Sequence, residues 1–497
     1  MNGYTVINSA DNVAVALTSL AKGLDAAGGF PVELRDDIPA GHKFSLRRIP
    51  RGASVIKYGF PIGSALEDIP EGSHVHTHNT KTNLKGEIEY AYRPCFFPLP
   101  PPPARLEFAG YRRAGGEAGI RNEVWIIPTV GCVNETGRAL EAAARERHPP
   151  ASHFDGVRFF AHPYGCSQMG DDQSATQRIL AGLASHPNAG GALILGLGCE
   201  NNNITEFKKA FTGYDAARVR FLNIQDTEDE LGAALALIGE LVTLCEHDRR
   251  EPFPADALRV GLKCGGSDGL SGITANPLLG KFSDSLLAAG GTTVLTEVPE
   301  MFGAETLLLN RCKDAAIFAQ AADMINGFKR YYERHNQVIY ENPSPGNKAG
   351  GITTLEDKSL GCVQKGGRGP VTGILRYGDR LREKGLNLLE GPGNDIVAVT
   401  ALAAAHVHLI LFTTGRGTPL GAPVPVIKVS TNTPLALRKK NWIDFDAGRV
   451  CADLTAADNL AAELYEQTLR TASGEIKTKN ELNGFYDMAI FKNGITL

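Results

Sequence analysis

Hydrophobic and polar positions divide the chain into regions with different periodicities. Residues 1 to about 92 show short β-type segments separated by Gly- and Pro-containing turns. The proline run Pro100–Pro103 that follows can continue neither a helix nor a central strand, and it would hold a stiff extended conformation. From residue 109 onward, short apolar runs alternate with helical stretches. This alternation is typical of parallel sheets that helices cover on both faces.

The pattern predicts a multidomain α/β protein with mostly parallel sheets behind a small all-β domain. We expect the β domain at residues 1–92, a proline-rich linker at 93–108, a first α/β domain at 109–255 and a second at 256–497. The expected strands of the first α/β domain are EVWIIPTV, GVRFFAH, GALILGLG and RVRFLNI, and those of the second are RVGLKC, TTVLTEV, VHLILFTT and VPVIKVS.

Composition narrows the class of protein. The 497 residues are 43% hydrophobic and carry a net charge of −4 without a long basic stretch, so nucleic acid is not an expected partner. We find no signal peptide and no apolar run long enough to cross a membrane. Nine cysteines, an odd number spread over a long chain, argue against a disulfide framework. We therefore expect reduced thiols and a cytoplasmic location.

The segment HVHTHN places His74, His76 and His78 at alternate positions, so an extended backbone would present all three on one face. Imidazole is the commonest protein ligand for iron, zinc and copper. A half-exposed strand in which histidine alternates with Val75 and Thr77 explains the spacing equally well. The spacing alone leaves both interpretations open, because no cysteine or carboxylate closely flanks the triplet.

Cysteines recur where the predicted strands end. Cys132, Cys166, Cys199 and Cys264 each follow an apolar run and stand beside small or amide residues. Parallel sheets bind ligands at the carboxyl ends of their strands, although any single cysteine could simply fill a tight corner. The absence of a CxxC pair makes an iron–sulfur cluster the weaker interpretation. A mononuclear ferrous site that combines imidazoles with a thiolate or carboxylate is also chemically allowed.

Polar loops in the last third suggest a binding site for a small anion. Lys348 lies in a loop rich in Gly and Pro, which could also be an ordinary solvated connection. Arg416 follows a strand between two glycines, where a rigid guanidinium could hold a carboxylate bidentately. The chain lacks GxGxxG, GxxxxGK[ST] and GxSxG motifs, so neither a nicotinamide enzyme nor a serine hydrolase is indicated. A polyhydroxylated anionic substrate fits these loops better.

Longer motifs carry a family resemblance over nearly the whole chain. They include GHKF, HVHTHN, VGCVN, YGCSQ, GLGCENN, CGGSDGLSGITANP, ENPSPGNKAGGITTLEDKSLGC, FTTGRGTP and WIDFDAG. With them the chain resembles the altronate/galactarate dehydratase family, which also contains sulfolactate sulfo-lyase. The resemblance implies a β-clip SAF domain before two α/β units. It also implies metal-dependent dehydration of D-altronate to 2-dehydro-3-deoxy-D-gluconate and water, with Fe²⁺ as the cofactor and Mn²⁺ as the alternative.

The chemistry of that reaction suggests roles for the polar residues. We expect Lys348 to act as base and His74 as acid, with His408 as a third catalytic candidate, although a histidine in an apolar strand is by default part of the core. The candidate metal ligands are His76, His78, Glu200, Cys166 and Cys199. The candidate substrate-binding residues are Arg416, Thr418, Asn432, Ser267, Asp268, Asn276, Ser167 and Gln168.

Four alternatives remain: galactarate dehydratase, sulfolactate sulfo-lyase, an iron–sulfur dehydratase, and a non-catalytic sugar-acid sensor, since a fold alone does not fix function. The sensor is disfavoured because Lys348, Arg416 and the histidines are all present. We expect a homodimer, because dimers are the commonest state of soluble enzymes.

Overall fold

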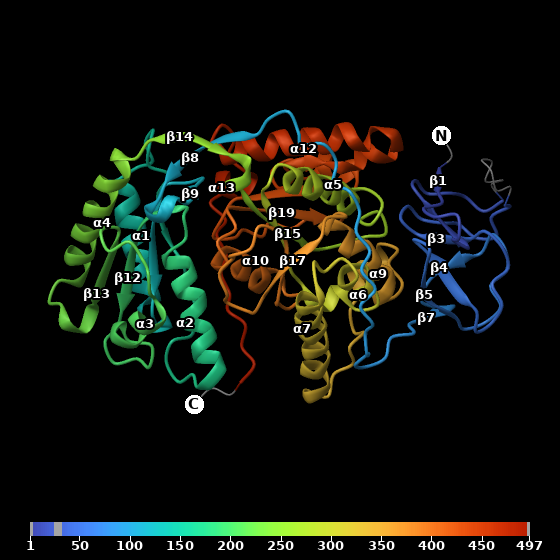
Figure 1. Ribbon diagram of the computed structural model, residues 1–497, viewed down its shortest axis with the longest axis horizontal. Helices are drawn as coiled ribbons and strands as arrows, with labels where there is room; N and C mark the ends of the chain where they lie inside the picture. Colours follow the sequence, from blue (N-terminus) through green and yellow to red (C-terminus); the bar gives the residue numbers. More distant parts are fainter. Residues whose placement is uncertain (1–2, 24–31, 495–497) are drawn as a thin grey trace.

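A computed structural model describes residues 3–23 and 32–494. The chain folds into three bodies arranged in a row (Figure 1). A small N-terminal β module stands at one end, the first α/β domain stands at the other, and the second α/β domain lies between them. Small antiparallel sheets therefore precede two α/β regions with parallel sheets, as the sequence pattern predicts. Within the described ranges, none of the helices has the length and apolar character needed to cross a bilayer.

The β module consists of two small antiparallel sheets, ordered β1-β2-β3-β6 and β4-β5-β7. Val13, Ile62 and Val75 are buried in its interior. The strands are β1 (Tyr4–Thr5), β2 (Val13–Ala16), β3 (Lys43–Ser45), β4 (Ser54–Lys57), β5 (Phe60–Ala65), β6 (His74–Val75) and β7 (Thr80–Lys81). Because the strands are short, the module depends on its neighbour for much of its burial.

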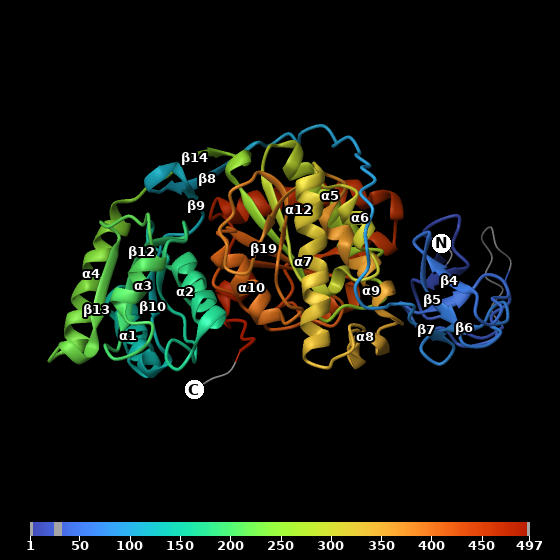
Figure 2. The same ribbon diagram turned by 60° about the horizontal axis from the view of Figure 1, so that its bottom comes forward.

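The segment after the β module contains neither helix nor strand from residue 82 to residue 106. It crosses the second α/β domain and climbs past α7 to reach the first (Figures 1 and 2). Cys95 N donates to Asn310 O at 2.8 Å, and the Tyr92 hydroxyl donates to Cys312 O at 2.6 Å. The linker is thus fastened to the middle body along its length rather than hanging free.

The first α/β domain is built on a parallel sheet ordered β11-β10-β12-β13. Its strands are β10 (Glu123–Pro128), β11 (Gly156–Phe159), β12 (Ala189–Gly196) and β13 (Val219–Asn223), and its helices are α1 (Asn134–Arg147), α2 (Gly170–Ala184), α3 (Ile204–Ala210) and α4 (Glu230–His247). A second sheet, β14-β8-β9, is antiparallel and contains β8 (Glu107–Arg112), β9 (Ala118–Gly119) and β14 (Arg250–Pro254). The carboxyl ends of the parallel strands meet at one edge, near α3 in Figure 1.

The second α/β domain has a seven-stranded parallel sheet, ordered β17-β18-β16-β15-β19-β20-β21. Its strands are β15 (Arg259–Cys264), β16 (Thr292–Leu295), β17 (Val371–Leu375), β18 (Gly385–Leu389), β19 (Leu409–Thr414), β20 (Val426–Ser430) and β21 (Phe445–Asp446). Its helices are α5 (Ala275–Ala288), α6 (Glu305–Leu309), α7 (Ala315–Arg334), α8 (Pro345–Ala349), α9 (Leu355–Cys362), α10 (Asp395–Ala404), α11 (Thr433–Arg438), α12 (Ala457–Ala472) and α13 (Lys479–Leu482).

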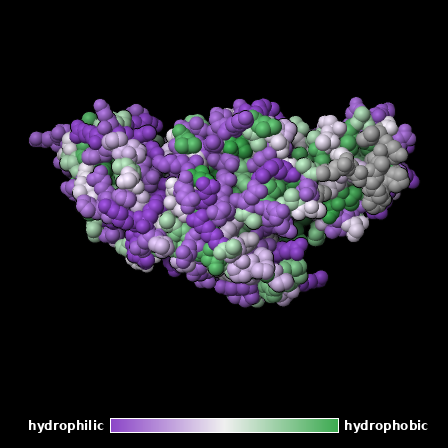
Figure 3. Space-filling view, turned by 90° about the horizontal axis from the view of Figure 1, so that it is seen from above, coloured by the Kyte–Doolittle hydropathy of each residue, from purple (hydrophilic) through white to green (hydrophobic). Residues whose placement is uncertain are grey.

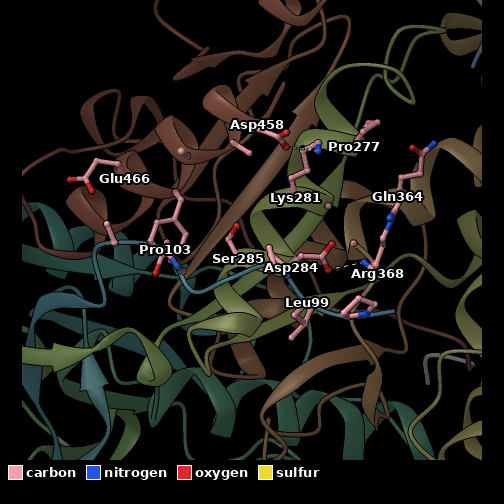
Figure 4. Close-up of a pocket in the computed structure, with 18 of the residues that line it drawn as sticks. Leu99, Pro103, Pro277, Lys281, Asp284, Ser285, Gln364, Arg368, Asp458 and Glu466 are labelled. Carbon is pink, nitrogen blue, oxygen red and sulfur yellow. Dashed lines mark hydrogen bonds and ion pairs between the residues drawn. The ribbon is translucent and has the colours of Figure 1, made fainter. Parts of the chain in front are cut away.

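The surface shows no concentration of apolar residues on the face seen from above, where hydrophilic residues dominate and apolar ones are scattered (Figure 3). A groove of about 920 Å³ lies between the linker and helices α5 and α12 (Figure 4). Several of its charged side chains already have partners: Lys281 Nζ lies 2.6 Å from Asp458 Oδ1, Arg105 Nη1 lies 2.7 Å from Glu466 Oε1, and Asp284 accepts the backbone amide of Arg368 at 2.7 Å.

Candidate functional site

Four histidines of the β module form one cluster. His42 directly precedes β3 and His74 opens β6, and the antiparallel pairing of these strands brings the two rings together. The ring centroids of His42 lie 5.1 Å from those of both His74 and His76, and the His74 and His78 centroids lie 5.5 Å apart. The structure thus confirms that the triplet converges. It adds His42, whose place in the cluster only strand pairing reveals.

Hydrogen bonds fix the tautomers of this cluster. His42 Nε2 lies 3.3 Å from the carbonyl oxygen of Ala349, which can only accept, so Nε2 carries the proton. In a neutral ring, His42 Nδ1 is then an acceptor, and it takes the hydrogen bond from His74 Nε2 at 3.0 Å. That leaves His74 Nδ1 as a free lone pair. His42 is therefore a positioning residue that orients the ring of His74.

Burial keeps these rings neutral. It lowers the pKa of His74 to about 4, with further contributions from His42 and His78, and it lowers the pKa of His76 to about 4 with help from the Lys43 ammonium. A neutral imidazole accepts a proton or binds a cation at pH 7. The cluster therefore offers lone pairs rather than acidic protons.

The histidine cluster faces a loop of the second α/β domain. His76 Nδ1 lies 3.1 Å from Thr353 Oγ1, and His42 contacts Ala349 at the end of α8. Lys348, the residue before Ala349, is half-buried on the same short helix. The structure thus brings the predicted lysine loop and the histidine triplet together from opposite parts of the sequence.

A buried ionic triad holds the β module in this place. Asp357 of α9 binds Lys43 Nζ at 2.8 Å and Lys57 Nζ at 3.0 Å, and all three side chains are at least 98% buried. Lys43 Nζ also donates to the carbonyl of Gly351 at 2.7 Å. Despite its burial, the two ammonium groups hold the pKa of Asp357 well below its usual range. Breaking such a pair leaves uncompensated buried charge, which typically costs about 3–5 kcal/mol.

Asp268 is the centre of the polar loops at the carboxyl edge of the seven-stranded sheet. Its Oδ2 accepts hydrogen bonds from Thr431 Oγ1 at 2.8 Å and Asn432 Nδ2 at 3.3 Å, and its Oδ1 accepts one from Ser271 Oγ at 3.0 Å. Burial raises the pKa of Asp268, although these donors oppose the shift. The loops after β15 and β20 thus meet as the sequence predicts.

The loop after β15 also contacts the segment that faces the histidines. Asn347 Nδ2 donates to Ser267 O at 2.8 Å, and Gly269 N donates to Gly350 O at 2.7 Å. Residues after β15 therefore contact the helix that carries Lys348. Strand ends, lysine loop and histidine cluster form one continuous polar region at the border of the β module.

Arg416 lies at this region with its side chain exposed. Its backbone amide donates to Gly266 O at 3.0 Å, which fixes the loop after β19 beside the loop after β15. Thr418 is half-buried and its Oγ1 accepts the Leu420 amide at 3.2 Å. An exposed guanidinium on a fixed backbone is suited to a ligand carboxylate.

Asn276 is a structural residue and not the substrate-binding residue that the sequence suggests. Its Nδ2 donates to Gly361 O at 3.0 Å and its Oδ1 accepts from Thr413 Oγ1 at 2.7 Å, and the side chain is fully buried. These bonds occupy both amide atoms of Asn276. The residue therefore shapes the site by joining α5, α9 and β19.

Tyr58 enters the site from the β module and was not predicted. It stands at the tip of the β4–β5 hairpin with φ of 62°, followed by Gly59 with φ of 77°, as a type I′ turn requires. Its hydroxyl reaches so close to Gly272 that a Cβ there would lie 2.1 Å from it. Positive φ is uncommon for an aromatic residue, so the surrounding packing must hold it. Tyr58 and Lys358 line one small cavity with Asp268.

Behind that cavity lies a buried group of thiols and charges. Cys264 Sγ lies 3.6 Å from Cys362 Sγ, 2.9 Å from Glu300 Oε2 and 2.9 Å from Lys365 Nζ, and Lys358 Nζ lies 2.8 Å from Glu300. The hydrogen bond with Cys362 and the Lys365 ammonium lower the pKa of Cys264 to about 6 despite burial.

Cys264, Glu300 and Cys362 could in geometry hold a metal ion, because their ligand atoms all lie within 4.8 Å of one another. The lysines already balance these negative charges, however. These acidic groups are therefore already paired with ammonium groups, which leaves less negative charge for a cation to balance.

The predicted ligands of the first α/β domain lie apart from this region. Glu200 caps its own loop, since its carboxylate accepts the amides of Leu197 at 3.1 Å and Gly198 at 2.6 Å. Cys166, Ser167, Gln168 and Cys199 belong to the same domain, which stands at the opposite end of the row from the β module (Figure 1). Within one chain the structure does not bring these residues to His76 and His78.

His408 also lies outside the site. It precedes β19 at the amino end of the sheet, whereas the polar loops gather at the carboxyl end. Its Nδ1 accepts the Arg259 amide at 3.1 Å, and burial lowers its pKa to about 3. His408 is thus a core histidine between the two α/β domains, and a catalytic assignment for it has no support in this geometry.

Family comparisons cover the three bodies in turn. The model described as the Altronate/galactarate dehydratase SAF domain matches residues 2–83. The model of the D-galactarate dehydratase/Altronate hydrolase second domain matches residues 110–246. The model of the D-galactarate/Altronate dehydratase C-terminal domain matches residues 255–496.

Individual relatives match over the full length. The altronate dehydratase of Escherichia coli (strain K12) is 52% identical over 99% of this chain and 100% of its own length. The altronate dehydratase of Bacillus subtilis (strain 168) is 51% identical over 100% of both chains. The galactarate dehydratase (L-threo-forming) of Escherichia coli (strain K12) is 32% identical over 98% of this chain and 96% of its own.

Proposed function

The chain belongs to the altronate/galactarate dehydratase family, and we propose that it removes water from D-altronate to give 2-dehydro-3-deoxy-D-gluconate. It is an enzyme, a hydro-lyase that breaks a carbon–oxygen bond in a small sugar acid. The observation that carries the choice of substrate is the 51–52% full-length identity to two altronate dehydratases, against 32% to a galactarate dehydratase. The alternative reading as a galactarate enzyme or a sulfo-lyase is therefore disfavoured.

The reaction sets clear demands on the site. The C2 proton leaves, the C3 hydroxyl departs as water, and the resulting enol tautomerises to the 2-keto acid. Negative charge accumulates on the substrate carboxylate as the C2 proton is removed, so cationic groups must face that carboxylate. In this proposal Arg416 binds the carboxylate, while Ser267 and Thr418 contact hydroxyl groups along the sugar chain. Asn432 instead holds the loop in place, because its Nδ2 donates to Asp268 and its Oδ1 accepts the Leu435 amide.

Two groups move the protons. Burial lowers the pKa of His74 to about 4, so the ring is neutral at pH 7, and its free Nδ1 can accept the C2 proton but has none to donate. The ammonium of Lys348, on the facing helix, is then the group that protonates the departing C3 hydroxyl. This assignment exchanges the two roles expected from the sequence. The physical reason is that desolvation keeps the imidazole neutral.

The family implies a divalent cation, Fe²⁺ or Mn²⁺. Among the described residues, no three of the clustered histidines bring their ligand atoms within 4.8 Å of one another, so the cluster would supply two imidazoles to such a cation rather than a complete protein site. Neutral imidazole nitrogens are suitable ligands for such ions, and burial keeps His76 neutral. In this proposal His76 and His78 hold the cation, which would supply positive charge beside the substrate carboxylate. His42 keeps the neighbouring ring in the correct tautomer.

Turnover of three acids tests the proposed function. Purified protein, reduced and supplied with ferrous iron, is incubated with D-altronate, galactarate or sulfolactate, and formation of 2-keto-3-deoxy acid or sulfite is followed. We expect kcat/KM to be highest for D-altronate. A higher value for galactarate or release of sulfite would contradict the substrate assignment, and no turnover of any acid would contradict the enzymatic role.

Metal content and state of assembly are measured on the same preparation. Replacement of His76 by Ala should lower both bound iron and turnover, whereas retention of both would remove His76 from the metal site. We also propose that the enzyme works in the cytoplasm as a homodimer. All nine cysteines are free, which fits a reducing compartment, and light scattering during size-exclusion chromatography gives the oligomeric state.

A further inference from the structure

Three exposed cysteines lie at one edge of the first α/β domain and have no part in the proposed site. Cys132, Cys166 and Cys199 follow β10, β11 and β12, which are adjacent in the sheet order β11-β10-β12. All three are free and exposed, whereas Cys245 of the same domain is buried. Free cysteine is among the residues most often buried, so three exposed ones at neighbouring strand ends call for an explanation. We refer to these three as the cysteine triplet.

Hydrogen bonds hold the three loops side by side. Gly131, just before Cys132, donates its amide to Tyr164 O in the second loop at 2.8 Å. Gly165, just before Cys166, accepts the Asn202 amide of the third loop at 2.9 Å. Each bond involves a residue next to a cysteine or close to one. The backbones of the triplet are therefore neighbours.

Two further hydrogen bonds connect the third loop to the first loop and to the second. Asn202 Nδ2 donates to Thr129 O at 2.9 Å, which joins the third loop to the first. The Ser167 amide donates to Asn201 Oδ1 at 2.8 Å, and Ser167 has a φ of 57°, which is unusual for a residue other than glycine. Every pair of loops is thus connected, and the geometry beside Cys166 is imposed by its surroundings.

An unpartnered polar group lies in the same place. The Gln168 side chain is only 2% exposed and its Oε1 accepts the Gly165 amide at 3.2 Å, yet its Nε2 has no hydrogen-bond partner. Buried donors almost always have an acceptor, and leaving one unpaired costs about 1–3 kcal/mol. Gln168 therefore indicates an acceptor at the triplet that the chain does not itself supply.

The spacing of the triplet argues against a single metal ion. Thiolates that share one tetrahedral ion bond it at roughly 2.3 Å, which places their sulfurs within about 4 Å of one another. Among the described residues, the triplet is not a group whose ligand atoms all lie within 4.8 Å of one another. A cluster with several irons takes each thiolate on a different iron and so accepts a wider spacing.

We propose that Cys132, Cys166 and Cys199 bind a four-iron iron–sulfur cluster, with three irons held by thiolates and the fourth left without a cysteine ligand. Ligation deprotonates the three thiols, so binding of the cluster releases three protons. The absence of a CxxC pair does not exclude this site, because folding assembles the ligands from three separate loops.

Cluster reconstitution tests the proposal. The full-length protein is incubated without oxygen with ferric iron, sulfide and a thiol that reduces part of the iron to the ferrous state, then desalted and analysed for iron, acid-labile sulfide and visible absorption. We expect about four sulfides per chain, and about four irons beyond the single iron proposed for the histidine cluster. Cys132→Ser, Cys166→Ser and Cys199→Ser should each lose most of the sulfide. Cys95→Ser, which removes an exposed cysteine of the linker, is the matched control and should bind as the wild type does.

The possible outcomes separate this site from the proposed function. Iron without sulfide, or equal sulfide in the wild type and the three variants, would overturn the cluster. Circular dichroism shows whether each variant is folded, and replacing an exposed thiol by a hydroxyl should not disturb folding. Because turnover of D-altronate is measured separately, an active enzyme without sulfide refutes the cluster alone.

Discussion

The Nδ1 atom of His42 and the Nε2 atom of His74 lie 3.0 Å apart, although 32 residues separate them in the sequence. The Ala349 carbonyl on the far side of His42 sets the direction of this hydrogen bond and so leaves His74 Nδ1 free. A residue of one domain thereby selects the tautomer of a histidine in another.

Replacing His42 by Ala should reduce turnover without removing any proposed ligand. Loss of an orienting hydrogen bond behind a functional imidazole typically costs about 10–100-fold in activity or metal affinity. The measurement is kcat with D-altronate together with bound iron. His247→Ala changes an exposed histidine on α4 and serves as the control. Unchanged kcat in the His42 variant would show that the tautomer is not set by this contact.

Replacing Arg416 by Lys should raise KM for D-altronate more than it lowers kcat. Lysine keeps the charge but loses the planar pair of donors, and a hydrogen bond to a charged group is worth about 1.5–3 kcal/mol. We expect kcat/KM to fall by about 10–100-fold. Arg438→Lys changes an exposed arginine of α11 and is the matched control. Equal kcat/KM for both variants would exclude Arg416 from binding the carboxylate.

Adding one methyl group at Gly272 should displace the Tyr58 hairpin. A Cβ there would lie 2.1 Å from the Tyr58 hydroxyl and 2.9 Å from Gly361 Cα. We expect Gly272→Ala to destabilise the protein by about 1–3 kcal/mol and to impair turnover. Gly393→Ala, where a Cβ meets nothing within 4 Å, should do neither. Thermal unfolding and kcat measure the two effects, and full activity of Gly272→Ala would place Tyr58 outside the site.

Acid should loosen the β module between about pH 6.5 and pH 4. Burial lowers the pKa of His74 and His76 from 6.5 to about 4, so the unfolded chain binds more protons than the folded one in this window. The free energy of unfolding therefore falls as the pH falls through it.

Because His162 in the first α/β domain has a similarly lowered pKa of about 4, the measurement must be local to the β module. Hydrogen exchange at β3 and β6 meets this need. In a His74→Gln, His76→Gln double variant, exchange should depend less on pH. An equally steep dependence in that variant would assign the effect to other groups.

The sequence predicts the parts of the fold with long, regular patterns. The helical stretches at α1, α2 and α7 and the apolar runs at β10, β12, β15 and β19 all form as expected. Strands β17 and β18 escape notice because Thr372 and Gly373 interrupt the apolar character of β17 and Asn387 interrupts that of β18. β17 is an edge strand and β18 lies between β17 and β16, so both acquire their structure from pairing with neighbouring strands rather than from their own pattern.

The site is predicted only in pieces. Asp268, Asn432 and Arg416 stand at strand ends, and parallel topology alone brings those ends together. His42 and Tyr58 are isolated residues of the β module, so nothing in the local sequence marks them. The position of Glu200 after a strand suggests a metal ligand, but its carboxylate accepts hydrogen bonds from the backbone amides of Leu197 and Gly198. The way the domains pack against one another depends on tertiary contacts, which no local sequence pattern encodes.

Asp357 between Lys43 and Lys57 has a consequence for the path of the sugar acid. An outward movement of the β module in each catalytic cycle would separate the Asp357 carboxylate from the Lys43 and Lys57 ammonium groups and leave three unpaired, partly desolvated charges. The β module therefore stays in place during catalysis. The substrate must instead enter at the border between the β module and the second α/β domain, where His78 and Arg416 are both exposed to solvent. Diffusion along that rim, and not domain opening, then governs how quickly substrate is captured.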